Sequence, residues 1–148
     1  MRLLIQRVTS ARVDIAGETV GTIGQGLLIL VGVTDTDAEA EAVWTARKAA
    51  NLRIFPDDDG RMNRSVIDVG GQALVVSQFT LYGTVGKGNR PSYNQAAGPD
   101  HAEALYDQFV EHLAEHIGRP VETGRFGANM QVHLVNDGPV TIWVERGA

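Results

Sequence analysis

Alternation of apolar and polar residues dominates both ends of the chain. Between residues 3 and 33, Ala11, Val13 and Ile15 alternate with charged neighbours, and Gly17 marks a turn before the next apolar positions. The same period of two returns over residues 130–134 and again over residues 140–144. This period is typical of half-buried strands. We therefore expect a β-meander at the N-terminal end and two strands at the C-terminal end.

Two other segments have the period of a helix. The first follows Asp35-Thr36-Asp37 and runs to Asn51, and the second begins at Gly98-Pro99-Asp100 and ends at Gly118. Acidic residues or proline before a helix and glycine after it are common boundaries. The residues expected along one face are Ala40, Val43, Trp44 and Arg47 in the first helix, and Ala102, Leu105, Tyr106, Phe109, Leu113 and Ile117 in the second.

These elements predict one domain over residues 1–148. A further buried strand is expected at residues 73–78. Runs of strands with two inserted helices favour the α/β class, with mainly antiparallel β-sheets and a helical layer (β/β/α). A chain of 148 residues with 43% hydrophobic and 21% charged residues suits a single globular core.

Composition also limits the compartment and the cofactors. The apolar runs are far shorter than the ~20 residues of a membrane span, and no targeting segment is recognised. The sequence has no cysteine, which excludes disulfides and thiol catalysis and fits a reducing compartment. We expect a cytoplasmic protein without a membrane partner. The glycine-rich stretches 21–26 and 83–88 match neither the P-loop nor the dinucleotide spacing, so no cofactor is expected.

Residues 83–99 form a long segment without any period. Glycine and proline recur through it, and Lys87 and Arg90 are its only cations. Unstructured loops longer than ~12 to 15 residues are uncommon unless they are functional or disordered. Two interpretations stay open: a flap over a substrate or tRNA, or a plain surface excursion.

Hydroxyl groups are the candidate chemical groups, but no base accompanies them. Ser77 and Thr80 stand at the end of the expected strand, and a hydroxyl is a poor nucleophile without a neighbouring base. The chain has no Gly-x-Ser-x-Gly elbow, and its four histidines lie within the second helix or a strand. A Ser-His-Asp hydrolase is therefore disfavoured.

One metal-binding pattern competes. The segment from His112 to His116 reads H-x-x-E-H, which places both imidazoles on one helical face as in some zinc peptidases. No third ligand follows it, and Glu111 and Glu115 are typical of a solvated charged face. We expect no metal site, and zinc hydrolysis using His112 and His116 stays the lesser alternative.

Two motifs carry a resemblance that covers the whole chain. They are Ser77-Gln78-Phe79-Thr80-Leu81 and Asn136-Asp137-Gly138-Pro139-Val140-Thr141, each where a strand meets a bend. Together they resemble the signature of the D-aminoacyl-tRNA deacylase family. The resemblance implies hydrolysis of the ester between a D-amino acid and the 3′ end of tRNA. It also implies a homodimer with active sites at the subunit interface, built from two sheets and a helical layer.

The resemblance assigns roles to particular residues. Ser77, Gln78, Phe79 and Thr80 would be catalytic: backbone N–H groups near Phe79 and Thr80 would stabilise the oxyanion, and the 2′-hydroxyl of the terminal adenosine would replace a protein nucleophile. A cis Gly138-Pro139 peptide would enter the partner's site and exclude L side chains, so that glycyl-tRNA would also be cleaved. Residues expected to support that motif or line the pocket are Asn136, Thr141, Arg7, Phe126 and Met130.

Charge weighs against a general nucleic-acid binder. The net charge is −5, the pI is near 5.3 and aromatic residues make up 6% of the chain. A non-catalytic nucleic-acid-binding module would normally carry a basic face. That module is the main alternative to an enzyme, and the expected tRNA contact is weak and confined to the 3′ end.

Overall fold

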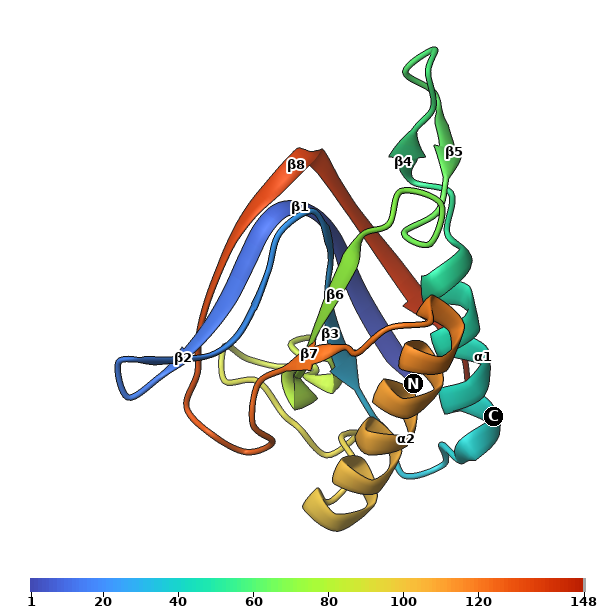
Figure 1. Cartoon of the computed structure of the whole chain (residues 1–148). Coiled ribbons are helices and arrows are strands. Elements are labelled where there is room, and N and C mark those ends of the chain that lie inside the picture. The colour runs from blue at the N-terminus through green and yellow to red at the C-terminus, as the bar shows by residue number, and fades with distance from the viewer. Residues whose placement is uncertain (148) are drawn as a thin grey trace.

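The computed structural model describes residues 1–147 and has a strongly curved sheet flanked by two helices (Figure 1). Along the chain its elements are β1 (Arg2–Ile15), β2 (Glu18–Ile23), β3 (Gly26–Gly32), α1 (Glu39–Asn51), β4 (Phe55–Pro56), β5 (Met62–Arg64), β6 (Gln72–Ser77), the 3₁₀ helix η1 (Phe79–Tyr82), α2 (Pro99–Ile117), β7 (Glu122–Thr123) and β8 (Gln131–Glu145). The short β4–β5 hairpin projects away from the rest (Figure 1).

The main sheet has the order β2-β1-β3-β6-β7, and β8 also pairs with β1. Strand β3 pairs with residues 2–8 of β1 and β2 with residues 11–15, whereas β8 pairs along residues 2–14. Strand β1 is antiparallel to β2, β3 and β8, whereas β6 is parallel to both β3 and β7. The far edges approach each other closely, because a Cβ atom on Gly21 of β2 would lie 2.6 Å from the carbonyl oxygen of Thr123 in β7. The sheet is therefore curled almost into a barrel.

Hydrophobic packing fills both sides of the central strands. Neighbouring residues of β3 point to opposite faces: Ile29 packs towards the helices, and Leu28 packs inside the curl. In β6, Val75 and Leu74 divide in the same way. Strands buried on both faces read as continuous apolar runs rather than as alternation. The expected class, mainly antiparallel sheet with a helical layer, is confirmed, although the parallel β3–β6 pair was not expected.

Two expectations about elements were wrong. The C-terminal segment is one long strand, β8, which bends sharply midway (Figure 1), and its pairing with β1 shifts register around Val8. Helix α1 begins at Glu39, where a Glu41 carboxylate oxygen accepts from the Ala38 N–H at 2.7 Å. Its buried face is made of other residues than expected, namely Glu41, Ala42, Thr45, Ala46, Ala49 and Ala50. The apolar stripe of α2 is confirmed at every position.

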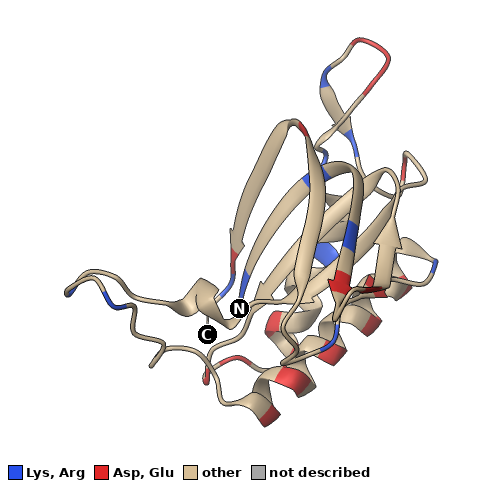
Figure 2. Ribbon diagram, turned by 90° about the vertical axis from the view of Figure 1, so that its left-hand side faces the viewer, with Lys and Arg blue, Asp and Glu red and all other residues tan. Residues whose placement is uncertain are grey.

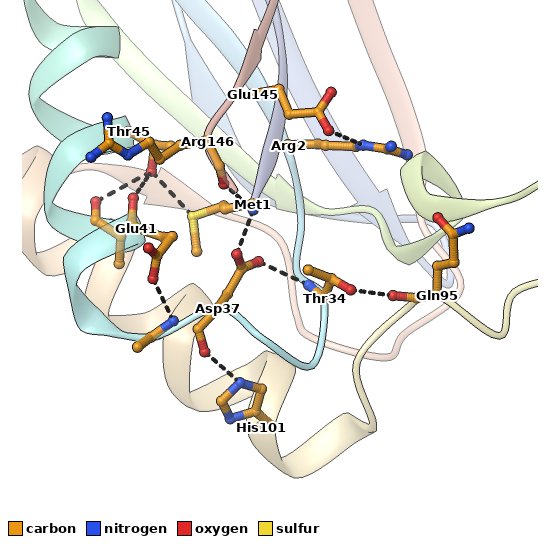
Figure 3. Close-up of polar contacts among 12 residues, drawn as sticks. Met1, Arg2, Thr34, Asp37, Glu41, Thr45, Gln95, His101, Glu145 and Arg146 are labelled. Carbon is orange, nitrogen blue, oxygen red and sulfur yellow. Dashed lines mark hydrogen bonds and ion pairs between the residues drawn. The ribbon is translucent and has the colours of Figure 1, made fainter. Parts of the chain in front are cut away.

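The N-terminal amine lies within the fold (Figure 3). The Met1 ammonium lies 2.6 Å from Asp37 Oδ1, and both side chains are fully buried. The other Asp37 carboxylate oxygen accepts from the Thr34 N–H at 2.9 Å, and the Asp37 carbonyl contacts His101 Nε2 at 2.8 Å. Asp37 therefore joins β1, the loop before α1 and the start of α2. Within residues 1–147, no helix is long and apolar enough to cross a membrane.

Candidate active site

A pocket of about 550 Å³ lies where the carboxyl ends of β3 and β6 meet the start of α2. Ser77, Gln78 and Phe79 form one side of it, and the loop before β8 forms another through residues 126–130. Tyr93, Ala96 and Ala97 of the long loop complete the rim. The carboxyl ends of parallel strands commonly border ligand sites in α/β sheets.

The Ser77–Thr80 motif changes from strand to helix at the pocket edge. The Gln78 N–H donates to the Val31 carbonyl at 2.7 Å, which extends the β3–β6 pairing by one residue. The chain then enters η1 at Phe79, so the N–H groups of Phe79 and Thr80 open a helix and have no acceptor within it. The Gln78 side-chain amide donates to Thr80 Oγ1, which holds that exposed hydroxyl in place. The local structure therefore presents backbone donors and one oriented hydroxyl.

Among residues 1–147, no charged side chain lines the pocket. Tyr106 donates its hydroxyl hydrogen to the Val75 carbonyl at 2.8 Å, and burial raises the pKa of this phenol well above its usual value. Of the four histidines in the sequence, none borders the pocket. Among the described residues, Ser77 thus has no histidine or carboxylate beside it in the pocket lining that could act as a base.

Aromatic and sulfur-containing side chains contribute to the apolar wall beside valines and alanines. Phe79 and Tyr93 pack edge to face with ring centroids 5.1 Å apart, and Phe126 packs on Tyr106 at 6.1 Å. Met130 lines the same cavity. The structure therefore brings Phe79, Phe126 and Met130 to one pocket. Sequence reasoning missed the pocket role of Tyr106, because its place in the apolar stripe of α2 marked it only as a core residue.

The second motif lies elsewhere in the same chain. Gly138 and Pro139 form a cis peptide, are exposed at the bend of β8 and are not part of the pocket wall. Asn136 spans the bend: its Nδ2 donates to Thr141 Oγ1 at 2.9 Å, and its Oδ1 accepts from the Val140 N–H at 3.1 Å. These two hydrogen bonds of the Asn136 side chain hold the bend in one conformation.

Arg7 supports this bend from below. Its side chain is almost buried, and Nε donates to the Asp137 carbonyl at 3.2 Å while Nη1 donates to the Ile54 carbonyl at 2.6 Å. An Asp137 carboxylate oxygen lies 3.4 Å from the guanidinium Nε. A Cβ atom on Gly138 would lie 3.1 Å from Arg7 Nη2, which favours glycine at this position. Arg7 of β1 therefore connects two other segments: the bend of β8, through Asp137, and the link between α1 and β4, through Ile54.

In the described residues, His112 and His116 of the H-x-x-E-H pattern are not part of a metal-ligand cluster. His112 lies 3.6 Å from Glu39 and 3.8 Å from Glu115, at the surface of the helical layer. Across the part of the chain that the structure describes, no group of three or more His, Cys, Asp or Glu side chains is arranged to hold a metal ion. His112 and His116 thus belong to a polar helix face.

Three large apolar residues of β8 are exposed. Leu134, Val135 and Trp143 are 36%, 54% and 47% exposed, the first two before the bend and the third after it.

The chain is similar to a protein-family model, to curated relatives and to solved structures. The model of the family described as D-Tyr-tRNA(Tyr) deacylase matches residues 4–145. A "D-aminoacyl-tRNA deacylase" of Salinibacter ruber is 57% identical over 148 residues, covering 100% of this chain and 99% of the relative. A solved structure titled "c-Myc DNA Unwinding Element Binding Protein" is 43% identical with a TM-score of 0.94, covering 100% of both chains. A structure titled as a probable eukaryotic D-amino acid tRNA deacylase shares the fold, at 18% identity and a TM-score of 0.83, covering 97% of both chains.

Proposed function

Because this chain belongs to the D-Tyr-tRNA(Tyr) deacylase family, we propose that it is a hydrolase that cleaves the ester bond of D-aminoacyl-tRNA. The products are a free D-amino acid and tRNA. The observation that carries the proposal is the position of Ser77, Gln78 and Phe79 at the rim of an uncharged pocket. Such a reaction belongs in the cytoplasm, where aminoacyl-tRNA is used.

The chemistry needs little from side chains. An aminoacyl ester is already activated, so the protein has to orient its carbonyl, stabilise the oxyanion and admit water. In this scheme the water oxygen bonds to the carbonyl carbon, and the negative charge collects on the carbonyl oxygen beside the N–H groups of Phe79 and Thr80. Collapse then breaks the bond to the ribose 3′-oxygen, which takes a proton. One oxyanion donor contributes about 3 to 4 kcal/mol, or several hundredfold in rate.

A hydroxyl group of the substrate can take the role that a protein base would otherwise have. Because the described part of the pocket wall holds no histidine or carboxylate, the vicinal 2′-hydroxyl of the terminal adenosine is the group proposed to assist proton transfer. Phe126 and Met130 offer an apolar wall for the adenine. The catalytic roles therefore fall on Ser77, Gln78, Phe79 and Thr80, with the backbone supplying the central donors.

Chiral selection is assigned to the partner subunit. Gly138 and Pro139 are exposed but lie outside the pocket of their own chain, so a second copy is needed to bring them to a substrate. In this proposal the protein is a homodimer, and the exposed Val135 of β8, close to the bend in sequence, contributes to its interface. The Gly138-Pro139 bend, supported by Asn136, Thr141 and Arg7, blocks the side chain of an L-amino acid. Glycine has no side chain to block, so glycyl-tRNA is also a substrate.

A second candidate function comes from one comparison. The 43% identical structure named for a DNA unwinding element keeps a non-catalytic nucleic-acid-binding module in consideration. Binding alone would leave both stereoisomers of the ester intact, which makes the two functions separable.

The decisive experiment compares D-tyrosyl-tRNA with L-tyrosyl-tRNA. Purified, chelator-treated protein is expected to release D-tyrosine rapidly while the L ester decays at the rate without protein. Equal indifference to both esters would contradict the enzymatic proposal and favour the binding module. Activity that is lost with the chelator and restored by zinc would instead return His112 and His116 to consideration.

A further inference from the structure

The long loop between η1 and α2, which we call the basic loop (residues 83–98), projects from the pocket rim. Residues 84–91 are all exposed, and Lys87 and Arg90 lie in that stretch. Figure 2 shows this loop reaching away from the sheet with two basic positions towards its tip. Such exposed cations at the entrance to an active site are positioned to meet a charged substrate before the chemistry occurs.

The base of the basic loop is firmly held. Thr84 and Ser92 exchange two backbone hydrogen bonds of 2.8 and 2.9 Å, which close the loop below Lys87 and Arg90. The Ala97 N–H donates to the Val33 carbonyl at 2.9 Å. Phe79 of η1 packs edge to face on Tyr93 of the loop, with ring centroids 5.1 Å apart, so η1 and the loop are in close contact. The cations are therefore presented from a fixed stem that also lines the pocket through Tyr93.

A third cation lies on the other side of the pocket. Arg125 is exposed and immediately precedes Phe126, Gly127 and Ala128, which line the cavity. Within the described residues, Lys87, Arg90 and Arg125 make no ion pair, whereas Arg2, Arg7, Arg12 and Arg64 each have a carboxylate partner. Cations without protein partners retain their full charge for an external anion.

The opposite charge dominates the neighbouring helix. The exposed acids of α2 are Asp100, Glu103, Asp107, Glu111 and Glu115, and Figure 2 shows acidic positions along the helices. A polyanion approaching the pocket is repelled from that side and attracted to the basic loop. This local asymmetry offsets the net charge of −5.

We propose that Lys87 and Arg90 of the basic loop, together with Arg125, bind the backbone phosphates of the single-stranded 3′ end of tRNA, next to the nucleoside that occupies the pocket. This inference rests on the proposed deacylase function. At ~3.3 Å per residue, Arg90 lies within ~10 Å of Tyr93 along the chain, and Lys87 lies within ~20 Å. That reach corresponds to the first few phosphates before the terminal adenosine. Phosphate contacts of this kind fix position without reading sequence.

The test separates phosphate binding from chemistry by using two substrates. One is D-tyrosyl-tRNA, and the other is D-tyrosyl-adenosine, which keeps the ester and the terminal nucleoside but has no phosphate. The double variant Lys87→Gln/Arg90→Gln removes two charges from the loop. The matched control, Arg47→Gln/Lys48→Gln, removes two exposed charges from α1. For each variant, binding of tRNA that carries no amino acid (uncharged tRNA) is also measured by fluorescence anisotropy between about 50 and 200 mM salt.

The loop variant is expected to lose about tenfold in kcat/KM for D-tyrosyl-tRNA and in affinity for uncharged tRNA, with the slope of log K against log salt reduced by about 1.4. Its rate on D-tyrosyl-adenosine should equal that of the unaltered protein. Adding Arg125→Gln should lower tRNA affinity further.

Two results would overturn the inference while leaving the deacylase function standing. In one, the loop variant matches the Arg47→Gln/Lys48→Gln control with tRNA. In the other, both substrates slow equally, which would mean that the loop shapes the pocket instead. If the unaltered protein cleaves neither ester, the proposed function fails, and the anisotropy measurement with uncharged tRNA still decides whether the loop binds RNA.

Discussion

The hydroxyl of Thr80 is oriented by a neighbour that belongs to the same motif. Gln78 donates its side-chain amide hydrogen to Thr80 Oγ1 at the start of η1. A hydroxyl held in this way can orient water or the ester carbonyl, while the Thr80 N–H is independent of the side chain. The two contributions can therefore be separated by mutation.

Replacing Thr80 by Ala or Val is expected to lower kcat for D-tyrosyl-tRNA by about tenfold, since one neutral hydrogen bond contributes about 1 to 1.5 kcal/mol. Thr80→Ser keeps the hydroxyl and should stay near the unaltered rate. Steady-state deacylation measures all three variants. Unaltered turnover in both Thr80→Ala and Thr80→Val would remove the hydroxyl from the mechanism and leave only the backbone.

Single residues also show what the sequence could predict about the site. Ser77, Gln78, Phe79, Phe126 and Met130 meet at one pocket, and a motif resemblance was sufficient to group them. Gly138 and Pro139 lie outside this pocket, and their place in the site of a partner subunit, which the resemblance implies, stays a prediction. The contacts of Arg7 with Asp137 and Ile54 depend on three segments that are distant in sequence.

At the scale of elements, α2 and β6 are joined by a buried hydrogen bond. Tyr106 packs among the core residues and donates its hydroxyl hydrogen to the Val75 carbonyl at 2.8 Å. Burial raises the pKa of the Tyr106 phenol above its usual value of 10.0. The folded protein therefore keeps this proton at a pH where the unfolded chain releases it.

Tyr106→Phe is expected to lower the free energy of unfolding by about 1 kcal/mol at neutral pH, because the Tyr106 hydrogen bond is lost while the Gly124 N–H still donates to the Val75 carbonyl at 3.3 Å. The raised pKa makes the Tyr106 contribution complete below pH 10.0, the ordinary tyrosine value, and lost as the pH rises above it. Stability of the Phe variant should therefore fall less steeply in alkali. Urea unfolding at several pH values measures both effects.

Tyr93→Phe is the matched control for this substitution, because Tyr93 is 41% exposed. Its stability should change by less than about 0.5 kcal/mol. An equal loss in both variants would mean that the buried hydrogen bond contributes nothing specific.

The buried face of α2 could be predicted from the sequence, whereas that of α1 could not. Large side chains such as Phe109 and Leu113 identify the buried face of α2 without ambiguity. The buried face of α1 consists mainly of alanines, while Val43 is 38% exposed. Alanine adds little hydrophobic signal, yet its small size allows close helix packing. The parallel β3–β6 pairing was also unreadable, since periodicity shows which face a residue takes but carries no strand direction.

At the scale of the whole molecule, one buried ion pair connects the first residue to both helical regions. Asp37 contacts the Met1 ammonium, the Thr34 N–H and His101 (Figure 3). Removing one member of a buried pair leaves the other charge uncompensated.

Asp37→Asn is expected to lower the free energy of unfolding by about 3 kcal/mol or more. Asp35→Asn makes the same chemical change at an exposed position two residues away and should have an effect within about 0.5 kcal/mol. Thermal and denaturant unfolding of both variants provide the comparison. Equal stability of the two variants would show that the buried pair contributes no net stabilisation.

The uncharged wall of the pocket has a consequence for chemical probing. Reagents that label hydrolases covalently depend on a serine or cysteine activated by a nearby base. Here the sequence contains no cysteine, and Ser77 shares the pocket with neither histidine nor carboxylate. A fluorophosphonate or a thiol-directed reagent therefore has nothing activated to modify. On the proposed function, inhibitors are expected to work by occupying the pocket, and non-hydrolysable analogues of an aminoacylated adenosine are the compounds to test.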